Sequence, residues 1–90
     1  MRGLAKHGHA ADEKAQRQAR QVQRLVGEKI RSIRHERLLT IEQLAELADI
    51  HPNYLGSVER GERNLSLLNI WRIARGLNVP AGALLSDVPR

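Results

Sequence analysis

The side chains of this chain that could do chemistry are cations and hydrogen-bonding amides rather than nucleophiles. Its 90 residues include no cysteine, which excludes a disulfide framework and a thiolate metal site. The sequence has no glycine-rich phosphate loop and no plausible serine–histidine–acid grouping. His7 and His9 supply two metal ligands without a third, so we expect no metal site and no cofactor. These features argue against an enzyme and indicate a protein that binds its partner reversibly.

A formal net charge of +5 favours a polyanionic partner. Residues 1–24 contain six Lys or Arg against two acids, whereas residues 25–64 contain six against seven. The excess of cations therefore lies largely outside the central segment. In a helix, Lys14, Arg17, Arg20 and Arg24 would share one face, because they recur every three or four residues. That face is either a solvated surface or an arm that contacts phosphate groups.

The central segment, residues 40–61, is expected to position the polar groups that meet such a partner. Thr40 and Gln43 have the spacing of a capping box, which predicts that a helix begins after Thr40. Pro52 suits the first turn of a second helix, and Gly61 suits a left-handed position after its end. Two short helices joined by a tight turn make a helix-turn-helix, whose second helix can enter a DNA major groove.

The flanking segments also predict helices. Residues 12–23 are strongly helix-forming but nearly all polar, so they either extend the next helix backward or become ordered on a partner. Residues 22–38 have the spacing of an amphipathic core helix. Ser66 is a suitable N-cap for a helix over residues 67–75, and a short last helix follows Pro80 over residues 81–86. On the helix over 67–75 we expect one apolar face made of Leu67, Ile70, Trp71, Ala74 and Leu77, with Ile73 at its edge.

Residues 39–79 resemble the Cro and phage-repressor type of helix-turn-helix regulator, the Xre group. Each matching piece is short, but their order along the chain is specific. The resemblance spans roughly residues 25–85 and implies an all-α, compact five-helix lambda-repressor-like domain with an extra N-terminal polar helix or tail. The matching pieces are Leu39-Thr40, Gln43-Leu44-Ala45, Ala48, Ile50, Tyr54-Leu55, Val58-Glu59-Arg60-Gly61, Asn64-Leu65-Ser66-Leu67 and Ala74-Arg75-Gly76-Leu77-Asn78-Val79.

This resemblance divides the chain into three parts. Residues 1–21 are a basic N-terminal tail, either flexible or a helical extension. Residues 22–86 are the helix-turn-helix DNA-binding domain, and residues 87–90 are a C-terminal tail. No stretch is apolar and long enough to suggest a membrane span, and the expected location is the cytoplasm of a bacterium, on nucleoid or phage DNA.

Carrying the resemblance over residue by residue places the start of the second helix, residues 52–60, in the groove. Pro52, Asn53 and Ser57 then occupy the base-reading positions. The Asn53 amide can pair with adenine through two hydrogen bonds, whereas Pro52 makes only apolar contacts and Ser57 discriminates poorly. Such a sparse surface suggests that DNA shape adds specificity. The resemblance places Thr40, His51, Tyr54, Arg60, Arg63 and Asn64 against the DNA backbone.

Two positions depart from the usual pattern. Ile41 stands where the family often has a glutamine that contacts a phosphate, so either docking on this side is weaker or Ile41 packs against the tail. Gly56 lowers helix propensity by about 1 kcal/mol relative to alanine. A glycine there indicates either close approach to DNA or a packing requirement.

The resemblance also implies one structural ion pair and one interface. An arginine at position 34 pairs in the family with the glutamate that is Glu59 here, and such a pair can fix how two helices meet. Family members often dimerise through their C-terminal region, and the apolar surface of this chain exceeds what one small core needs. We therefore expect a symmetric homodimer interface formed by Leu68, Val79, Leu84 and Leu85.

The sequence thus predicts a homodimeric, sequence-specific regulator of transcription that binds double-stranded DNA at a palindromic operator. It would act by occupying the operator or by contacting RNA polymerase. Its biological role would be that of a restriction-modification controller, a phage-type repressor or an antitoxin-like protein. The alternative is a protein-interaction module that keeps the fold and has lost the groove contacts. Ile41, Pro52 and Gly56 favour that alternative.

Overall fold

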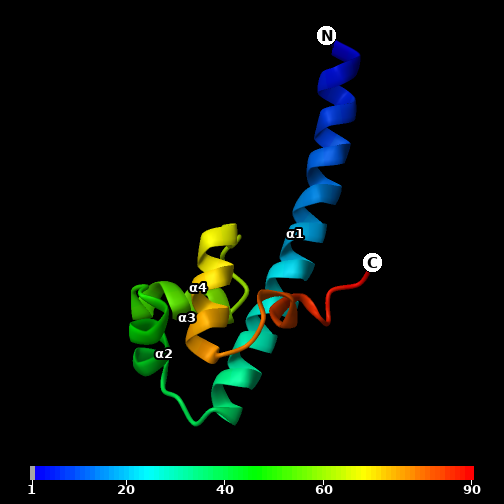
Figure 1. Ribbon diagram of the computed structural model, residues 1–90. Helices are drawn as coiled ribbons and strands as arrows, with labels where there is room; N and C mark the ends of the chain where they lie inside the picture. The colour runs from blue at the N-terminus through cyan, green and yellow to red at the C-terminus, as the bar shows by residue number, and fades with distance from the viewer. Residues whose placement is uncertain (1) are drawn as a thin grey trace.

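Four α-helices and a 3-10 turn make up the computed structural model, which describes residues 2–90 and their side chains from residue 11 onward (Figure 1). The side chains of His7 and His9 therefore lie outside the described residues. The all-α fold is confirmed, with a 3-10 turn in place of the expected fifth helix and no strand in the part described. The elements are α1 (Arg2–Glu36), α2 (Ile41–Ala48), α3 (Pro52–Glu59), α4 (Leu67–Leu77) and η1 (Ala81–Leu85).

Helix α1 joins two segments that the sequence analysis treated separately. The polar residues 12–23 and the amphipathic residues after them form one helix of 35 residues, which ends at Glu36 rather than Leu38. Leu38 follows in the left-handed region, with a φ of 57°, which stops the helix. Figure 1 shows the N-terminal half of α1 projecting well beyond the other helices. Residues 11–18 of this extension are all exposed.

The helix-turn-helix forms through the local signals that the sequence carries. The Thr40 hydroxyl accepts a hydrogen bond from the Gln43 N–H, and the Gln43 side chain accepts one from the Thr40 N–H, which completes the predicted capping box. Asp49 ends α2 in the left-handed conformation, with a φ of 58°. Pro52 then occupies the first turn of α3, as expected. Gly61 has a φ of 77°, which suits glycine and turns the chain away from α3.

An aliphatic core lies between α1, α2, α3, α4 and η1. Every element contributes fully buried side chains to this core, so no element can move without disturbing the packing of the others. These side chains are Ile30, Leu44, Leu55, Val58, Ile73, Leu77 and Leu84. Helices α1 and α3 approach most closely at Gly27. A Cβ at Gly27 would lie 2.7 Å from the Glu59 carbonyl oxygen, so only glycine permits this crossing.

The buried face of α4 differs from the expected one. Ile73, placed at the edge by the sequence, is fully buried, whereas Leu67 and Trp71 are 85% and 51% exposed. Helix α4 packs on α2 and η1 through Ile73, Ala74 and Leu77, and this orientation turns Leu67 and Trp71 to the outside. Asn78 takes the left-handed C-cap position, with a φ of 59°.

The C-terminal residues 87–90 also contact the domain. Asp87 forms an ion pair with Lys29 of α1, 3.1 Å between Oδ2 and Nζ. Val88 is partly buried against the core. Figure 1 shows the chain crossing α1 after η1 and ending on the side of α1 away from α2.

Candidate nucleic-acid interface

The exposed side of α3 begins at Asn53. Its side chain is exposed, and its amide makes no hydrogen bond within the described part of the chain. Its backbone N–H donates to Nδ1 of His51, the N-cap of α3, over 3.0 Å. Pro52 beside it is half-buried. The start of α3 thus presents one free amide on a backbone that a cap and a proline hold in place.

His51 has a structural task in addition to any contact outside the chain. Because Nδ1 accepts the Asn53 N–H, the imidazole ring is held at the end of the helix. The ring itself remains exposed, and Nε2 is left for another partner. A backbone contact from His51 is therefore compatible with its capping role.

Ser57 lies deeper than its expected base-reading role requires. It is 6% exposed, and its hydroxyl donates to the Tyr54 carbonyl oxygen over 2.6 Å. The same hydroxyl oxygen accepts a hydrogen bond from Nε of Arg63 over 3.1 Å. With both functions of the hydroxyl in use and almost no exposed surface, Ser57 is arranged to hold Arg63 rather than to reach a base.

Arg63 is held on two sides. Besides the Ser57 contact, its guanidinium lies over the ring of Tyr54, 5.7 Å from the ring centroid. The Tyr54 hydroxyl in turn accepts a hydrogen bond from the side-chain amide of Asn69 on α4, over 3.1 Å. The terminal nitrogens of Arg63 and the hydroxyl hydrogen of Tyr54 stay available, which suits two groups aimed at phosphates. Sequence reasoning missed Asn69, because nothing local signals a partner 15 positions away.

The remaining expected backbone contacts lie on exposed loops and helix ends. Arg60 pairs with Glu62, 3.1 Å between Nε and Oε2, and both side chains are more than half exposed, so solvent screens this pair. Asn64 is exposed in the loop after α3. Thr40 uses its hydroxyl oxygen in the capping box. Ile41 is half-buried and packs against the core of the domain. Its burial therefore does not require a contact with the N-terminal extension.

Arg34 and Glu59 form the ion pair that the family resemblance implies. Nε and Nη2 of Arg34 bond the two carboxylate oxygens of Glu59 at 2.7 and 2.9 Å, and Nη1 donates to the Leu39 carbonyl oxygen. Both side chains are buried. The hydrogen bond to Glu59 raises the pKa of Arg34 above its ordinary value, against the opposing effect of burial. The pair joins α1 to α3 and to the connection that leads into α2.

The proposed interface residues are not equivalent. Leu84 is 1% exposed and forms part of the monomer core, so its assignment to a dimer interface was wrong. Val79 is half-buried against the same core. Leu68 and Leu85 are exposed, and Leu67 and Trp71 lie beside Leu68 on the outer side of α4. We call these four exposed residues, Leu67, Leu68, Trp71 and Leu85, the outer apolar surface.

Among the described residues, no group of three His, Cys, Asp or Glu side chains could hold a metal ion. None of the described helices has the length and apolar character needed to cross a membrane. The candidate site consists of the exposed amides of Asn53 and Asn64, of Arg60 and Arg63, and of the starts of α2 and α3.

Comparison with known proteins places this geometry in context. The family model described as Helix-turn-helix, HTH_3, matches residues 30–84. Control protein C.SmaI of Serratia marcescens is 40% identical over 65 residues, which cover 72% of this chain and 77% of that protein. Control protein C.BamHI of Bacillus amyloliquefaciens is 42% identical over 62 residues, which cover 68% of this chain and 76% of that protein.

A solved structure agrees with these sequence relatives. The restriction-modification controller protein C.AhdI from Aeromonas hydrophila aligns with a TM-score of 0.68 and 37% identity. The alignment covers 69% of this chain and 94% of that one. The family match leaves residues 1–29 and 85–90 outside it.

Proposed function

The chain belongs to the helix-turn-helix family HTH_3, whose members are DNA-binding transcriptional regulators, and from this premise we propose that it binds a palindromic operator as a homodimer through α3. The observation that carries the proposal is the free Asn53 amide at the capped start of α3. An amide in this position suits bidentate pairing with adenine in a major groove. Pro52 would add an apolar contact beside it.

The surrounding cations supply the contacts that do not depend on sequence. Arg63 and Tyr54 are held together on one side of α3, and Arg60 and Asn64 are exposed near it. Thr40 and His51 lie at the starts of α2 and α3, where backbone N–H groups favour anions. In this arrangement Ser57 contributes by positioning Arg63, and base readout rests on Pro52 and Asn53.

The outer apolar surface supports the homodimer. Large apolar side chains that are exposed on a small protein, here three on α4 and one on η1, indicate an interaction site. Leu68 and Leu85 remain in the proposed interface, Leu67 and Trp71 join them, and Leu84 leaves it. A two-fold axis beside α4 would present two α3 helices about 34 Å apart, one turn of DNA. The operator would then be palindromic.

The named relatives favour one biological role. C.SmaI and C.BamHI are control proteins, and C.AhdI is a restriction-modification controller. We propose that this chain has a controller role of the same kind on DNA in a bacterial cytoplasm. It would act by occupying its operator or by contacting RNA polymerase there.

Selection from a random duplex library, followed by footprinting and a salt titration, tests the proposal. An enriched palindrome with half-sites about ten base pairs apart is the expected result. Binding without enrichment would contradict sequence-specific readout by α3. Absence of binding at low salt would contradict DNA binding altogether.

The second candidate is the protein-interaction module. The burial of Ser57 favours it, since only one exposed side chain of α3 then carries hydrogen-bonding information for bases. A specific protein partner together with no binding to any duplex at low salt would support it over the operator-binding proposal.

A further inference from the structure

We propose that Arg31 of α1 and Arg60 of α3 bind one phosphate of the DNA backbone in a cleft beside the reading side of α3. This inference rests on the proposed function and assigns a contact to Arg31, which the sequence alone did not single out. The cleft lies between α1, the start of α2 and the end of α3. It is lined by Arg31, Arg34, Ile41, Gly56, Glu59 and Arg60.

The cleft is wide enough for a phosphate group. Its volume is about 310 Å³. One water molecule occupies about 30 Å³ in the liquid, so the cleft has room for several waters or for one phosphate with its shell. It is open to solvent, as a site for a group on a long polymer must be.

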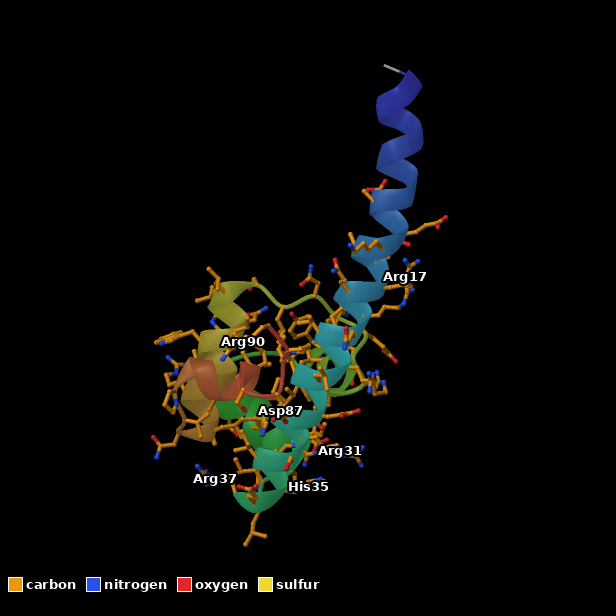
Figure 2. The ribbon with its side chains drawn as sticks, turned by 90° about the vertical axis from the view of Figure 1, so that its right-hand side faces the viewer. Arg17, Arg31, His35, Arg37, Asp87 and Arg90 are labelled. Carbon is orange, nitrogen blue, oxygen red and sulfur yellow. The ribbon has the colours of Figure 1, made fainter. Side chains whose placement is uncertain are left out.

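Among the cations that line the cleft, Arg31 has no described partner and Arg60 keeps one nitrogen free. Arg34 and Glu59 satisfy each other through their bidentate pair and add little net charge. Arg31 is exposed and has no hydrogen-bonding or ionic partner among the described residues. Figure 2 shows Arg31 pointing away from α1 into solvent. The cleft is therefore positive, with one cation that the rest of the chain leaves unmatched.

Arg60 turns one nitrogen toward the same cleft. Its Nε and Nη2 bond the Glu62 carboxylate, which leaves Nη1. A Cβ added at Gly56 would lie 3.2 Å from Nη1, so this nitrogen rests directly over the glycine. The missing side chain at Gly56 keeps that place clear for Nη1 and for whatever it binds. This gives a reason for a glycine inside a recognition helix.

The position of the cleft beside α3 favours a phosphate of the DNA backbone as its ligand. Asn53, Gly56 and Arg60 recur at helical spacing along α3, so the cleft borders the side of α3 that presents Asn53. If Asn53 enters the groove, the sugar–phosphate strand at the edge of that groove passes over Gly56. Ile41 at the cleft offers no hydrogen-bonding side chain, and Arg31 supplies the cation that this side of the motif otherwise lacks.

The test compares the full chain with Arg31→Gln and Arg90→Gln. Each variant loses one positive charge, and Figure 2 shows Arg90 on the opposite side of α1 from Arg31. Affinity is measured on the selected operator and on an unrelated duplex over a range of salt concentrations. For Arg31→Gln we expect a loss of about three- to tenfold per contact on both duplexes. The salt slope should be less steep by about 1.8, because the dimer loses one phosphate contact in each half-site. Arg90→Gln should leave the slope unchanged.

Replacing single DNA phosphates by uncharged methylphosphonates shows which phosphate the cleft contacts. Operators carrying one methylphosphonate at successive positions are titrated with the wild type and with Arg31→Gln. At one position per half-site, the wild type should lose more affinity than Arg31→Gln, because the variant keeps only the Arg60 part of that contact. Equal losses for both proteins at every position would overturn the inference.

The outcomes separate the two proposals. If the wild type binds DNA and Arg31→Gln behaves like Arg90→Gln, the cleft contact is wrong and operator binding stands. If the wild type binds no duplex, the proposed function fails and the cleft contact with it. Unfolding by urea should be equal for wild type and Arg31→Gln, since Arg31 contacts no partner within the described chain.

Discussion

Arg34 and Glu59 lie 25 positions apart in the sequence, yet two hydrogen bonds of 2.7 and 2.9 Å join their side chains in the interior of the domain. The pair ties α1 to the last turn of α3, and Nη1 of Arg34 also holds the Leu39 carbonyl before α2. It therefore fixes how α3 is positioned relative to the rest of the fold. The hydrogen bond to Glu59 raises the pKa of Arg34, so its guanidinium is charged in the pair.

Replacing Arg34 by leucine should destabilise the fold by about 3–5 kcal/mol, because Glu59 would be left buried and unpaired. The double replacement Arg34→Leu with Glu59→Leu should lose much less. Urea unfolding followed by circular dichroism measures both. If the single and double variants lost the same amount, the pair would not be the unit that holds α1 to α3.

Removing the Asn53 side chain should relax base preference. Asn53→Ala is expected to cost about 1–3 kcal/mol on the best operator and much less on unrelated duplexes. The fold should be unaffected, because only the Asn53 backbone makes a hydrogen bond among the described contacts. Repeating the library selection with the variant checks this. An unchanged preferred sequence would remove Asn53 from base readout.

Ser57→Ala distinguishes a positioning role from base reading. If the hydroxyl holds Arg63, its loss should weaken binding to all duplexes alike and should resemble a mild form of Arg63→Ala. If Ser57 reads a base, the loss should be confined to the operator. The ratio of affinities for operator and unrelated duplex decides between the two. We expect that ratio to stay constant.

Gly27→Ala should weaken the crossing of α1 and α3. The added Cβ would lie 2.7 Å from the Glu59 carbonyl oxygen, so the helices must move apart, at a cost of about 1–3 kcal/mol. Without this close contact, replacing glycine by alanine inside a helix would stabilise the helix. Gly82→Ala is the matched control, since no atom lies within 4 Å of a Cβ at that glycine. A more stable Gly27→Ala protein would contradict this packing.

Leu68→Ser should shift the proposed homodimer toward monomer. Sedimentation velocity over a range of protein concentrations measures the shift. Trp71, the single tryptophan, offers a second signal, because its fluorescence should move to shorter wavelength as the wild type dimerises and buries it. Leu38→Ser is the control, since Leu38 is 89% exposed after the end of α1. Equal dissociation of both variants would place the interface elsewhere.

The sequence was informative wherever a structural feature depends on neighbours within one helical turn. The Thr40–Gln43 capping box, the start of α3 at Pro52 and the Ser66 cap each join residues that are close along the chain. Such contacts form whatever the rest of the fold does, so residue type and spacing suffice to predict them. The Arg34–Glu59 pair was also anticipated, but only through a family resemblance, because no local spacing relates positions 34 and 59.

Only the tertiary structure decided which way each helix turns its side chains. Ser57 and Leu84 face inward and Trp71 faces outward, although a helical pattern alone allows each of them either environment. The rotation of a helix is set by the neighbours on which it packs, here α2 and η1 for α4, and those neighbours are distant in sequence. For the same reason the cleft between Arg31, Gly56 and Arg60 could not be read from the sequence: three elements meet there, and each contributes one side of it.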